Sequence, residues 1–579
     1  MTTQTKRWEV YPRAPETHLE KFPDLPRLIV QILYNRGIFA AQEVYEFLQA
    51  TRSEALPDPN QLKGMAVAVE RILQAVMTGE KIIVYGDYDA DGVTATVLMV
   101  QALRALGGRV EPYIPDRFEE GYGLNKQAIA DLAKTQASLA ITVDCGIRSG
   151  DEVAYGNELG LNFIITDHHQ VSKDEQGQDI VPPAIAVINP KQRACGYPFK
   201  ELAGVGIAFK LVQALKQAVG PEVCQRPGLA AENLLDLVAL GTVADLVPLI
   251  GENRALVKEG LAYVNAGRRV GLLALIEQSH LELGRITAGS ISFGLGPRLN
   301  AAGRLTHAQG AYKLLSTEDP VEAHQLAETL GRINYERQQM TQTFVDQARE
   351  QILVDDQIAP LYLITDPNFN HGVVGLVASR LVDEFYRPVL VGQQGDTLTR
   401  GSGRSILEFD ITAALDQCAD LLVKYGGHAA AAGFTVQNKN LPLFQARLIE
   451  IARQQLANKL LQRTLAVDAE INLRGVGYQL VKEIQDLQPF GYHNPTPRFM
   501  SSGLLVRHQT VVGRDGGHLK LKLFDGKQTW DAIGFGLGQA WPPQARLTRL
   551  DAVYSLEFNT WNGQTSLQLN LKDIKPSEV

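Results

Sequence analysis

Aspartates crowd one short segment of this sequence, GDYDADG, in which Asp87, Asp89 and Asp91 occupy alternate positions directly after the apolar run KIIVY. Alternate residues of an extended chain face the same side, so at least two of these carboxylates can point into one site. Carboxylates buried together repel one another and raise each other's pKa. A bound divalent cation removes that cost, whereas a solvated acidic turn is the alternative for an isolated pair.

Three further polar residues or groups follow or interrupt apolar runs. Asp144 follows ASLAITV, where a helix N-cap is the more frequent role for a single aspartate. Asp167, His168 and His169 follow LNFIIT. Adjacent histidines cannot both point to one place from a strand, so one is expected to bind metal and the other a phosphate oxygen, with ordinary surface histidines as the alternative. Asp245 interrupts LVALGTVADLVPL, where a lone carboxylate is costly unless it is paired or coordinated.

The types of these side chains select the metal. Several carboxylates with one imidazole and no thiolate suit Mn²⁺ or Mg²⁺ better than structural zinc. The set exceeds what one ion needs, so we expect two ions that share a carboxylate. Two ions about 3.5–4 Å apart activate water and stabilise the leaving oxygen of a phosphoester. The sequence therefore predicts hydrolysis of a phosphodiester or phosphoanhydride, and it contains no GxxxxGK[ST] loop for work driven by nucleotide triphosphates.

These residues need elements that bring them together. The short apolar runs KIIVY, ASLAITV, LNFIIT and AIAVI alternate with helix-like segments, which predicts βα units and a parallel sheet. Open α/β sheets bind ligands at the carboxyl ends of their strands, so the acidic segments should converge on one edge. A long helix from TEDPVEAH onward is followed by a second α/β pattern that begins at LYLITDP. Alternating apolar residues near the end of the chain predict a small antiparallel barrel.

Length and composition limit the whole chain. Its 579 residues predict three or four domains, and 45% hydrophobic with 21% charged residues exclude a disordered or fibrous protein. A net charge of −8 excludes a uniformly basic surface, so a polyanion site must be a local groove or a metal site. The four cysteines lack the spacing of a zinc knuckle or a disulfide framework. A polar start and the lack of a long apolar run predict a soluble, cytoplasmic protein.

The order of the motifs resembles that of a known family. DYDADG, VDCG, TDHHQ and GTVADLVPL resemble the successive motifs of the DHH phosphoesterase superfamily. YIPDRFEEGYG, ELAGVGIAFKL, GPRLNAAGRL and GGHAAAAGF resemble its bacterial RecJ branch, from about Lys81 to the end of the chain. The resemblance implies two α/β lobes (DHH and DHHA1) joined by a long helix, with a C-terminal OB-fold barrel. It also implies a 5′→3′ exonuclease that releases mononucleotides from single-stranded DNA in DNA repair and recombination.

The patterns and the resemblance together predict five regions. These are an N-terminal helical region (1–64), a DHH catalytic domain (65–320), a connecting helix (321–355), a DHHA1 domain (356–455) and a nucleic-acid-binding OB-fold (456–579). The implied substrate is single-stranded DNA, and the implied protein partners are a single-strand-binding protein and a helicase. We expect a monomer that does not associate with membranes.

The resemblance implies roles for individual residues. The positions that match the family's metal ligands are Asp89, Asp91, Asp144, His168 and Asp245, with Asp144 as the bridge between two ions. Asp87 matches the first acidic position, as a ligand or a neighbour of one, and Tyr85 stands where some relatives have a ligating histidine. His169 would contact the scissile phosphate and stabilise developing charge. The expected catalytic set is Asp87, Asp144, His168 and His169.

Capture of the substrate needs side chains that bind phosphate, and arginine does so through two parallel hydrogen bonds. Our predicted substrate contacts are Arg117, Arg298, Asn300, Arg304, Ser402, Arg404 and His428. A solvated charge is the alternative for each arginine, and a structural role at a loop or helix start is the alternative for His428. The glycines of GSGRS would let backbone N–H groups approach an anion, or form a plain turn. We expect the helix after GSGRS to end in KYGGHAAAAGF.

The barrel region mixes cations with aromatic rings, on which bases can stack for about 1–3 kcal/mol each. The cations are Arg507, Arg514, Lys520, Lys522 and Lys527, and the rings are Phe524, Trp530, Phe535, Trp541 and Trp561. Two other functions remain open. A DHH phosphodiesterase of short oligonucleotides, cyclic dinucleotides or polyphosphate would share the metal site but commonly lacks a barrel. An inactive replication or repair scaffold would have no need for so many mutually repelling carboxylates.

Overall fold

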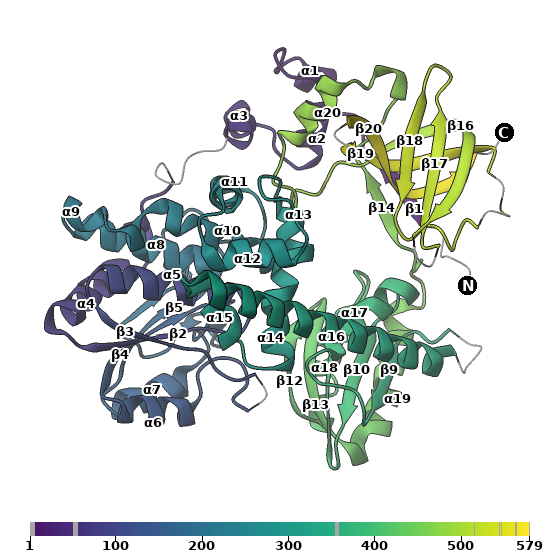
Figure 1. Cartoon of the computed structure of the whole chain (residues 1–579). Helices are drawn as coiled ribbons and strands as arrows, with labels where there is room; N and C mark the ends of the chain where they lie inside the picture. Colours follow the sequence, from purple (N-terminus) through teal and green to yellow (C-terminus); the bar gives the residue numbers. More distant parts are fainter. Residues whose placement is uncertain are drawn as a thin grey trace. The chain divides into compact units, whose positions relative to one another are not determined.

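A computed structural model describes residues 6–49, 56–117, 119–353, 358–513, 516–542, 545, 547–561 and 564–577, apart from the side chains of residues 232 and 561. Arg514 and the ring of Trp561 therefore lie outside the described part. The chain forms two compact units, one of Met1–Glu9 with Arg332–Leu465 and one of Val10–Gly331 with Ala466–Val579 (Figure 1). Within the described residues, no helix is both long and apolar enough to cross a lipid bilayer.

The second unit contains the predicted parallel sheet, with strand order β3-β2-β4-β5-β8. Its strands are β2 (Lys81–Tyr85), β3 (Arg109–Tyr113), β4 (Ala137–Val143), β5 (Asn162–Thr166) and β8 (Ala186–Ile188). The three central strands are almost wholly buried, which explains their continuous apolar runs. Strand β3 lacks such a run because it is a half-exposed edge strand, and the sequence pattern missed it.

Helices cover both faces of this sheet (Figure 1). They are α4 (Met65–Thr78), α5 (Ala90–Ala105) and α8 (Gly204–Ala218) in one hydrophobic cluster, and α6 (Lys126–Lys134) and α7 (Gly150–Glu158) in another. A two-stranded hairpin, β6 (Ser172–Lys173) with β7 (Asp179–Ile180), lies between β5 and β8 in the chain. The first cluster continues into α10 (Leu235–Ala244), which is buried on all sides and ends at Asp245, its C-cap.

From residue 221 to the unit boundary, the chain is mainly helical. The helices are α9 (Pro221–Cys224), α11 (Gly251–Ala266), α12 (Val270–Gln278), α13 (Ala288–Ser290), α14 (Gly296–Leu305), α15 (Gln309–Ser316) and α16 (Pro320–Leu353). Helix α16 is the predicted long helix, with 34 residues. The boundary between the two units falls within it, after Gly331.

The first unit contains a five-stranded mixed sheet of order β12-β13-β11-β10-β9, in which β9 and β10 are parallel and the other pairs antiparallel. Its strands are β9 (Tyr362–Asp366), β10 (Val389–Gln394), β11 (Leu398–Arg404), β12 (Leu422–His428) and β13 (Ala431–Gln437). Its helices, besides the end of α16, are α17 (Val374–Phe385), α18 (Ile411–Asp416) and α19 (Leu441–Leu456).

Two local predictions in this sheet are wrong. KYGGHAAAAGF does not end a helix but forms the hairpin of β12 and β13, where every second residue from Ala432 is buried. The alanines suggested a helix, but this alternation is that of a strand. The plain turn offered as the alternative for GSGRS is also wrong, because residues 401–404 of this segment form the end of strand β11. A Cβ at Gly401 would lie 2.4 Å from the Phe434 ring, so this glycine makes room for an aromatic side chain.

The chain ends in a closed barrel, since β16 pairs with both β17 and β19. Its strands are β16 (Phe499–Val512), β17 (His518–Phe524), β18 (Thr529–Gly534), β19 (Arg549–Trp561) and β20 (Gln564–Pro576). The elements before it are β14 (Thr464–Val467), β15 (Ala469–Glu470) and α20 (Tyr478–Gln485), and those at the chain start are β1 (Arg7–Val10), α1 (Glu16–Leu19), α2 (Arg27–Asn35) and α3 (Ala41–Gln49). The N-terminal helices share one hydrophobic cluster with the barrel, which the sequence did not indicate.

Candidate metal centre

The acidic segments meet at the carboxyl edge of the parallel sheet. Asp87 follows β2, Asp144 directly follows β4, and His168 lies two residues after β5. Three groups of side chains there have possible ligand atoms within 4.8 Å of one another: Asp87 with Asp89 and Asp144, Asp91 with His168 and Asp245, and Asp144 with His168 and His169. The groups overlap at Asp144 and His168, so the arrangement offers two adjoining cation positions.

The first turn of α5 fixes two of these aspartates. The Asp89 side chain caps the helix and accepts hydrogen bonds from the N–H groups of Asp91 and Gly92, at 2.9 and 3.1 Å. A Cβ at Gly92 would lie 2.6 Å from the Asp87 side chain, so only glycine lets the helix start this close to the preceding loop. Asp89 is therefore both an N-cap and a member of the acidic cluster.

The start of α8 holds Asp91. The N–H groups of Gly204 and Val205 donate to the two carboxylate oxygens of Asp91, at 2.7 and 2.9 Å. A helix N-terminus favours negative charge, so α8 stabilises the ionised carboxylate. A Cβ at Gly204 would lie 2.5 Å from Asp144, and one at Gly241 would lie 2.8 Å from Asp91 Oδ1. ELAGVGIAFKL thus contributes backbone N–H donors and glycines without side chains to the site, and the positions of ionisable residues in the sequence give no sign of this role.

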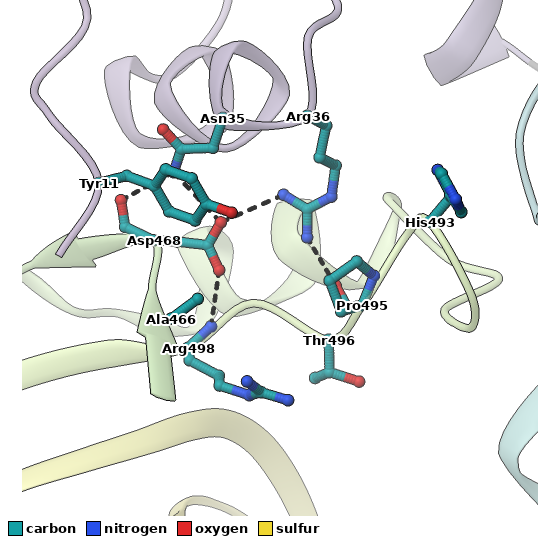
Figure 2. Close-up of a pocket in the computed structure, with 9 residues that line it drawn as sticks. All are labelled: Tyr11, Asn35, Arg36, Ala466, Asp468, His493, Pro495, Thr496 and Arg498. Carbon is teal, nitrogen blue, oxygen red and sulfur yellow. Dashed lines mark hydrogen bonds and ion pairs between the residues drawn. The ribbon is translucent and has the colours of Figure 1, made fainter. Parts of the chain in front are cut away.

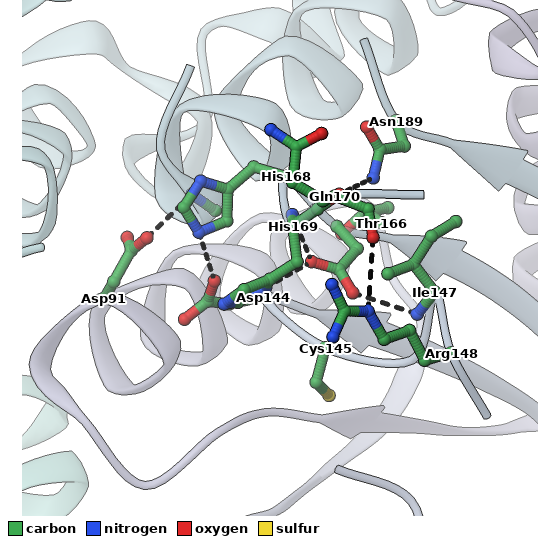
Figure 3. Close-up of polar contacts among 12 residues, drawn as sticks. Asp91, Asp144, Cys145, Ile147, Arg148, Thr166, His168, His169, Gln170 and Asn189 are labelled. Atoms are coloured by element: carbon green, nitrogen blue, oxygen red, sulfur yellow. Dashed lines mark hydrogen bonds and ion pairs between the residues drawn. The ribbon is translucent and has the colours of Figure 1, made fainter. Parts of the chain in front are cut away.

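Asp144 occupies a strained position. Its φ of 63° lies in the left-handed region, a conformation that costs a non-glycine residue on the order of 1–3 kcal/mol. Its N–H donates to Thr166 O at 3.0 Å, which ties the turn to the end of β5. Its Oδ1 lies 3.1 Å from His168 Nε2, and Asp245 Oδ2 lies 3.5 Å from the same nitrogen. Figure 3 shows the His168 ring pointing toward Asp91 and Asp144.

The electrostatics of the cluster favour a cation. Burial, and then the charges of neighbouring aspartates, raise the pKa values of Asp87, Asp144 and Asp245 far above the ordinary range, and raise that of Asp91 to about 7. Burial and the charge of His169 lower the pKa of His168 to about 3, which leaves a neutral ring able to bind metal.

Unsatisfied oxygens show that the residues fit a metal. Among the described residues, the buried Oδ1 atoms of Asp87 and Asp144 have no hydrogen-bond donor. Buried carboxylate oxygens without donors are costly, and a divalent cation supplies the missing partner. The donor set of carboxylates and one imidazole suits Mn²⁺ or Mg²⁺.

The second histidine of the pair has a different environment. His169 Nδ1 lies 2.7 Å from Asp167 Oδ1 and 3.1 Å from the Tyr122 hydroxyl. Asp167 also accepts from the N–H groups of His169 and Ile147. Burial would raise the pKa of Asp167, but the hydrogen bonds and the charge of His169 outweigh it and hold the pKa at about 2. Burial lowers the pKa of His169, but the hydrogen bond to Asp167 and the charge of Asp167 raise it, and the net shift is upward.

Tyr85, at the position of a ligating histidine in some relatives, has another role. It is 1% exposed, and its hydroxyl donates to Gly123 O at 3.1 Å. It thereby anchors the chain that carries Tyr122.

The predicted substrate contacts of this unit lie in varied surroundings. The Arg117 guanidinium lies over the Tyr88 ring, 5.0 Å from its centroid. Burial raises the pKa of Tyr88 to about 12, against the opposing charges of Arg117 and Arg304. Asn300 Oδ1 accepts from Ala90 N at 2.7 Å, which fixes the start of α5. Arg298 donates to Gln278 Oε1 and Gly294 O, both at 2.8 Å. Asn300 and Arg298 therefore have clear structural partners within the protein.

The other three predicted contacts lie on the mixed sheet of the first unit. Arg404 Nη1 donates to Ser402 Oγ at 2.6 Å and to Gly403 O at 2.7 Å. A Cβ at Gly375, in the first turn of α17, would lie 2.9 Å from Arg404 Nη2. His428 ends β12, is exposed, and accepts from Ala430 N at its own Nδ1.

A separate pocket of about 250 Å³ lies where α2 meets the chain around β14 and β15 (Figure 2). Its polar groups bond to one another: Asp468 accepts from Asn35 and Arg36, and Arg36 donates to Asn494 and Pro495. These bonds join the N-terminal helices to the barrel region, and the described part of the chain places no cluster of possible metal ligands there.

The fold and the site together define a DHH-type, metal-dependent phosphoesterase. The DHH family N-terminal domain matches residues 81–242, the DHHA1 domain matches 355–454, and the RecJ OB domain matches 467–573. The chain belongs to the family of RecJ single-stranded-DNA-specific exonucleases.

The relatives cover the chain almost completely. The exonuclease RecJ of Bacillus subtilis is 37% identical over 100% of this chain and 72% of its own length, and that of Escherichia coli is 36% identical over 96% of each. The crystal structure of Thermus thermophilus RecJ in complex with Mn²⁺ matches with a TM-score of 0.83 and 31% identity, over 99% of this chain and 80% of that one. The same protein in complex with Mg²⁺ matches with a TM-score of 0.77.

Proposed function

We propose that this chain is a metal-dependent exodeoxyribonuclease that releases mononucleotides from the 5′ end of single-stranded DNA, in DNA repair and recombination. The observation that carries this proposal is the pair of adjoining ligand groups that share Asp144 at the edge of the parallel sheet. Family membership supports the substrate, because the relatives are named single-stranded-DNA-specific exonucleases.

Two ions, Mn²⁺ or Mg²⁺, would be held by Asp87, Asp89, Asp91, Asp144, His168 and Asp245. Asp144 would bridge them, since it belongs to both sides of the cluster. When bound, such ions activate water and stabilise the leaving oxygen of a phosphodiester. The helix start at Gly204 orients Asp91 and favours its ionised form, and the neutral ring of His168 presents a nitrogen between Asp144 and Asp245.

His169 would contact the scissile phosphate. Its raised pKa favours the cation, which stabilises negative charge that develops on the phosphate oxygens. Asp167 holds the ring through Nδ1, and the Tyr122 hydroxyl, 3.4 Å from Nε2, lies beside the nitrogen that would face the substrate. The catalytic set is then Asp87, Asp144, His168 and His169, with Asp167 as a positioning residue.

Substrate contacts outside the centre remain predictions for Arg117, Arg298, Asn300, Arg304, Ser402, Arg404 and His428. The five-region division of the chain also remains a proposal. A single-strand-binding protein and a helicase as partners, a monomeric state and a cytoplasmic location are proposed on the resemblance and the sequence.

A phosphodiesterase of short oligonucleotides or cyclic dinucleotides is the second candidate, because it needs the same metal centre. The closed barrel counts against it, since a dinucleotide needs no additional strand-binding domain. An inactive scaffold is less well supported still, because burying unneutralised carboxylates has a cost that only a bound cation offsets.

Degradation of end-labelled single strands tests the proposal. Oligonucleotides labelled at either end are incubated with the protein and Mn²⁺ or Mg²⁺, and the products are sized over time. We expect mononucleotides from the 5′ end and no cleavage of blunt duplex. Digestion of dinucleotides alone, with long strands intact, would favour the second candidate, and activity in excess chelator would remove the metal mechanism.

A further inference from the structure

The chain between β3 and α6 reaches the metal centre without supplying a predicted ligand. Tyr122 places its hydroxyl 3.1 Å from His169 Nδ1 and 3.4 Å from the carbonyl oxygen of Asp144. Arg117 lies over the Tyr88 ring. Both side chains depend on how the described residues 116–117 and 119–123 are held, because these residues belong to no helix or strand.

One carboxylate holds this segment. Glu120 Oε1 accepts from the Tyr113 hydroxyl at 2.5 Å and from Asn125 Nδ2 at 2.9 Å. Its Oε2 accepts from Asp116 N at 2.5 Å. The three donors come from the end of β3, from the N-cap of α6 and from the segment itself, so the carboxylate joins two fixed elements to a loop.

The donors are themselves rigidly placed. Asn125 caps α6 by accepting from Ala128 N at 2.7 Å, and its amide lies 3.4 Å from the Tyr85 hydroxyl. The Tyr85 and Tyr113 rings pack with centroids 4.9 Å apart. Tyr85 then bonds to Gly123 O, one residue beyond Tyr122. Glu120 and Tyr85 thus hold the chain by hydrogen bonds on both sides of Tyr122.

We propose that Glu120 is a positioning residue, whose carboxylate fixes the loop so that Tyr122 meets His169. The inference rests on the proposed function, because His169 is the residue that would contact the scissile phosphate. A group that holds a contact residue in place affects the rate steeply, since a displacement of about 1 Å can cost about 10²-fold. Glu120 itself touches neither the substrate nor the ions.

Glutamine at this position isolates the effect. It keeps the shape of the side chain but replaces one acceptor oxygen by an amide NH₂, which faces a donor in either orientation. We expect Glu120→Gln to lower kcat for single-strand degradation by about tenfold to a hundredfold. Mn²⁺ affinity, measured by calorimetry, and the melting temperature should be unchanged. The matched control is Glu119→Gln, at the exposed neighbour, which should behave as the unmodified protein.

A second variant covers a failure to fold. Tyr113→Phe removes one donor to Glu120 and keeps the ring packing, so kcat should fall less than in Glu120→Gln. In the double variant the two effects should be less than additive, because both remove the same bond. If Glu120→Gln is unstable, a lower kcat in stable Tyr113→Phe supports the inference and an unchanged kcat overturns it.

The remaining outcomes separate the two proposals. Equal kcat values for Glu120→Gln and Glu119→Gln would overturn this inference alone, and loss of Mn²⁺ affinity together with kcat would overturn the positioning role in favour of a structural one. An unmodified protein that does not degrade single strands would overturn the proposed function and this inference with it.

Discussion

The chain contains two α/β sheets that treat polar side chains in opposite ways. The parallel sheet of the second unit buries Asp87 and Asp144 with oxygens that have no donor among the described residues. The mixed sheet of the first unit carries Arg404 and Ser402, which bond to each other and to the backbone. In the described part of the chain, the parallel sheet leaves carboxylate oxygens without donors, whereas the mixed sheet provides hydrogen-bond partners for its arginine.

The difference matches the ligands proposed for the two sheets, a divalent cation at the parallel sheet and a phosphate at the mixed sheet. A divalent cation offsets the free-energy cost of burying several carboxylates, so the parallel sheet suits a partner that is not part of the chain. An arginine that binds phosphate remains paired and partly exposed until the phosphate arrives, because its charge is easily solvated. Removing the cation should therefore affect the parallel sheet much more than it affects the mixed sheet.

Chelation is the widest test of this contrast, and it should abolish the exonuclease activity. Mn²⁺ at a hundred times its dissociation constant should stabilise the state that binds it by about 2.7 kcal/mol. Hydrogen exchange of the protein with and without Mn²⁺ should show slower exchange at the ends of β2, β4 and β5. Exchange in β10 and β11 should not change, and equal protection of both sheets would contradict the comparison.

Asp144→Asn comes next, because it removes the shared carboxylate and keeps its size. We expect kcat to fall by about 10³-fold or more, the upper range for loss of one charge-stabilising group. Mn²⁺ affinity, measured by calorimetry, should fall with it. Asp151→Asn, at an exposed position in the first turn of α7, is the control. A variant with full activity would mean that Asp144 bridges nothing.

Arg404→Ala tests the second sheet. Loss of a charged hydrogen-bond donor to phosphate, about 1.5–3 kcal/mol, should weaken single-strand binding roughly tenfold or more without a change in Mn²⁺ affinity. Arg404→Lys keeps the charge but not the planar guanidinium, so its affinity for single-stranded DNA should lie between those of Arg404→Ala and the unmodified protein. Fluorescence anisotropy with a labelled oligonucleotide measures both. The exposed Lys439→Ala is the control for a general loss of positive charge.

Phe535→Ala should have the smallest effect. Its ring is 59% exposed on the barrel, and one stacked base contributes about 1–3 kcal/mol, so affinity for long strands should fall at least about fivefold. Hydrolysis of a dinucleotide should be unchanged, and Phe535→Tyr should bind as the unmodified protein does. Unchanged affinity in Phe535→Ala would place the strand on another face of the barrel.

Deletion of the barrel is a poorer experiment than this substitution. Ile32 and Leu33 of α2 belong to the same hydrophobic cluster as the barrel residues. Arg254, on α11, donates to Phe47 O and to Leu487 O and lies over the Phe47 ring. Removing residues beyond 456 would expose this core and take away the Leu487 acceptor of the buried Arg254, so lost activity would not report on DNA binding.

Much of the site could be predicted because several of its ligands lie next to strands that their own sequence segments identify. An apolar run followed by an aspartate identifies a strand end, and parallel strands end at the same edge, so Asp87, Asp144 and His168 could be expected to converge. Asn300 and Asp167 show the limit of this reasoning. The bond from Ala90 N to Asn300 joins residues far apart in the chain, and the bond between His169 and Asp167 depends on the direction of the His169 ring. Residue type alone specifies neither bond.

The sequence by itself determined the chemistry of this protein, because the number and type of acidic residues that follow or interrupt apolar runs restrict the ligand to hard divalent cations. It also determined the parallel sheet, because buried strands need continuous apolar runs. Only the tertiary structure decided which groups orient the ligands: the helix start at Gly204 and the left-handed turn at Asp144. These depend on backbone direction and on contacts between residues distant in the chain, for which a sequence pattern holds no signal.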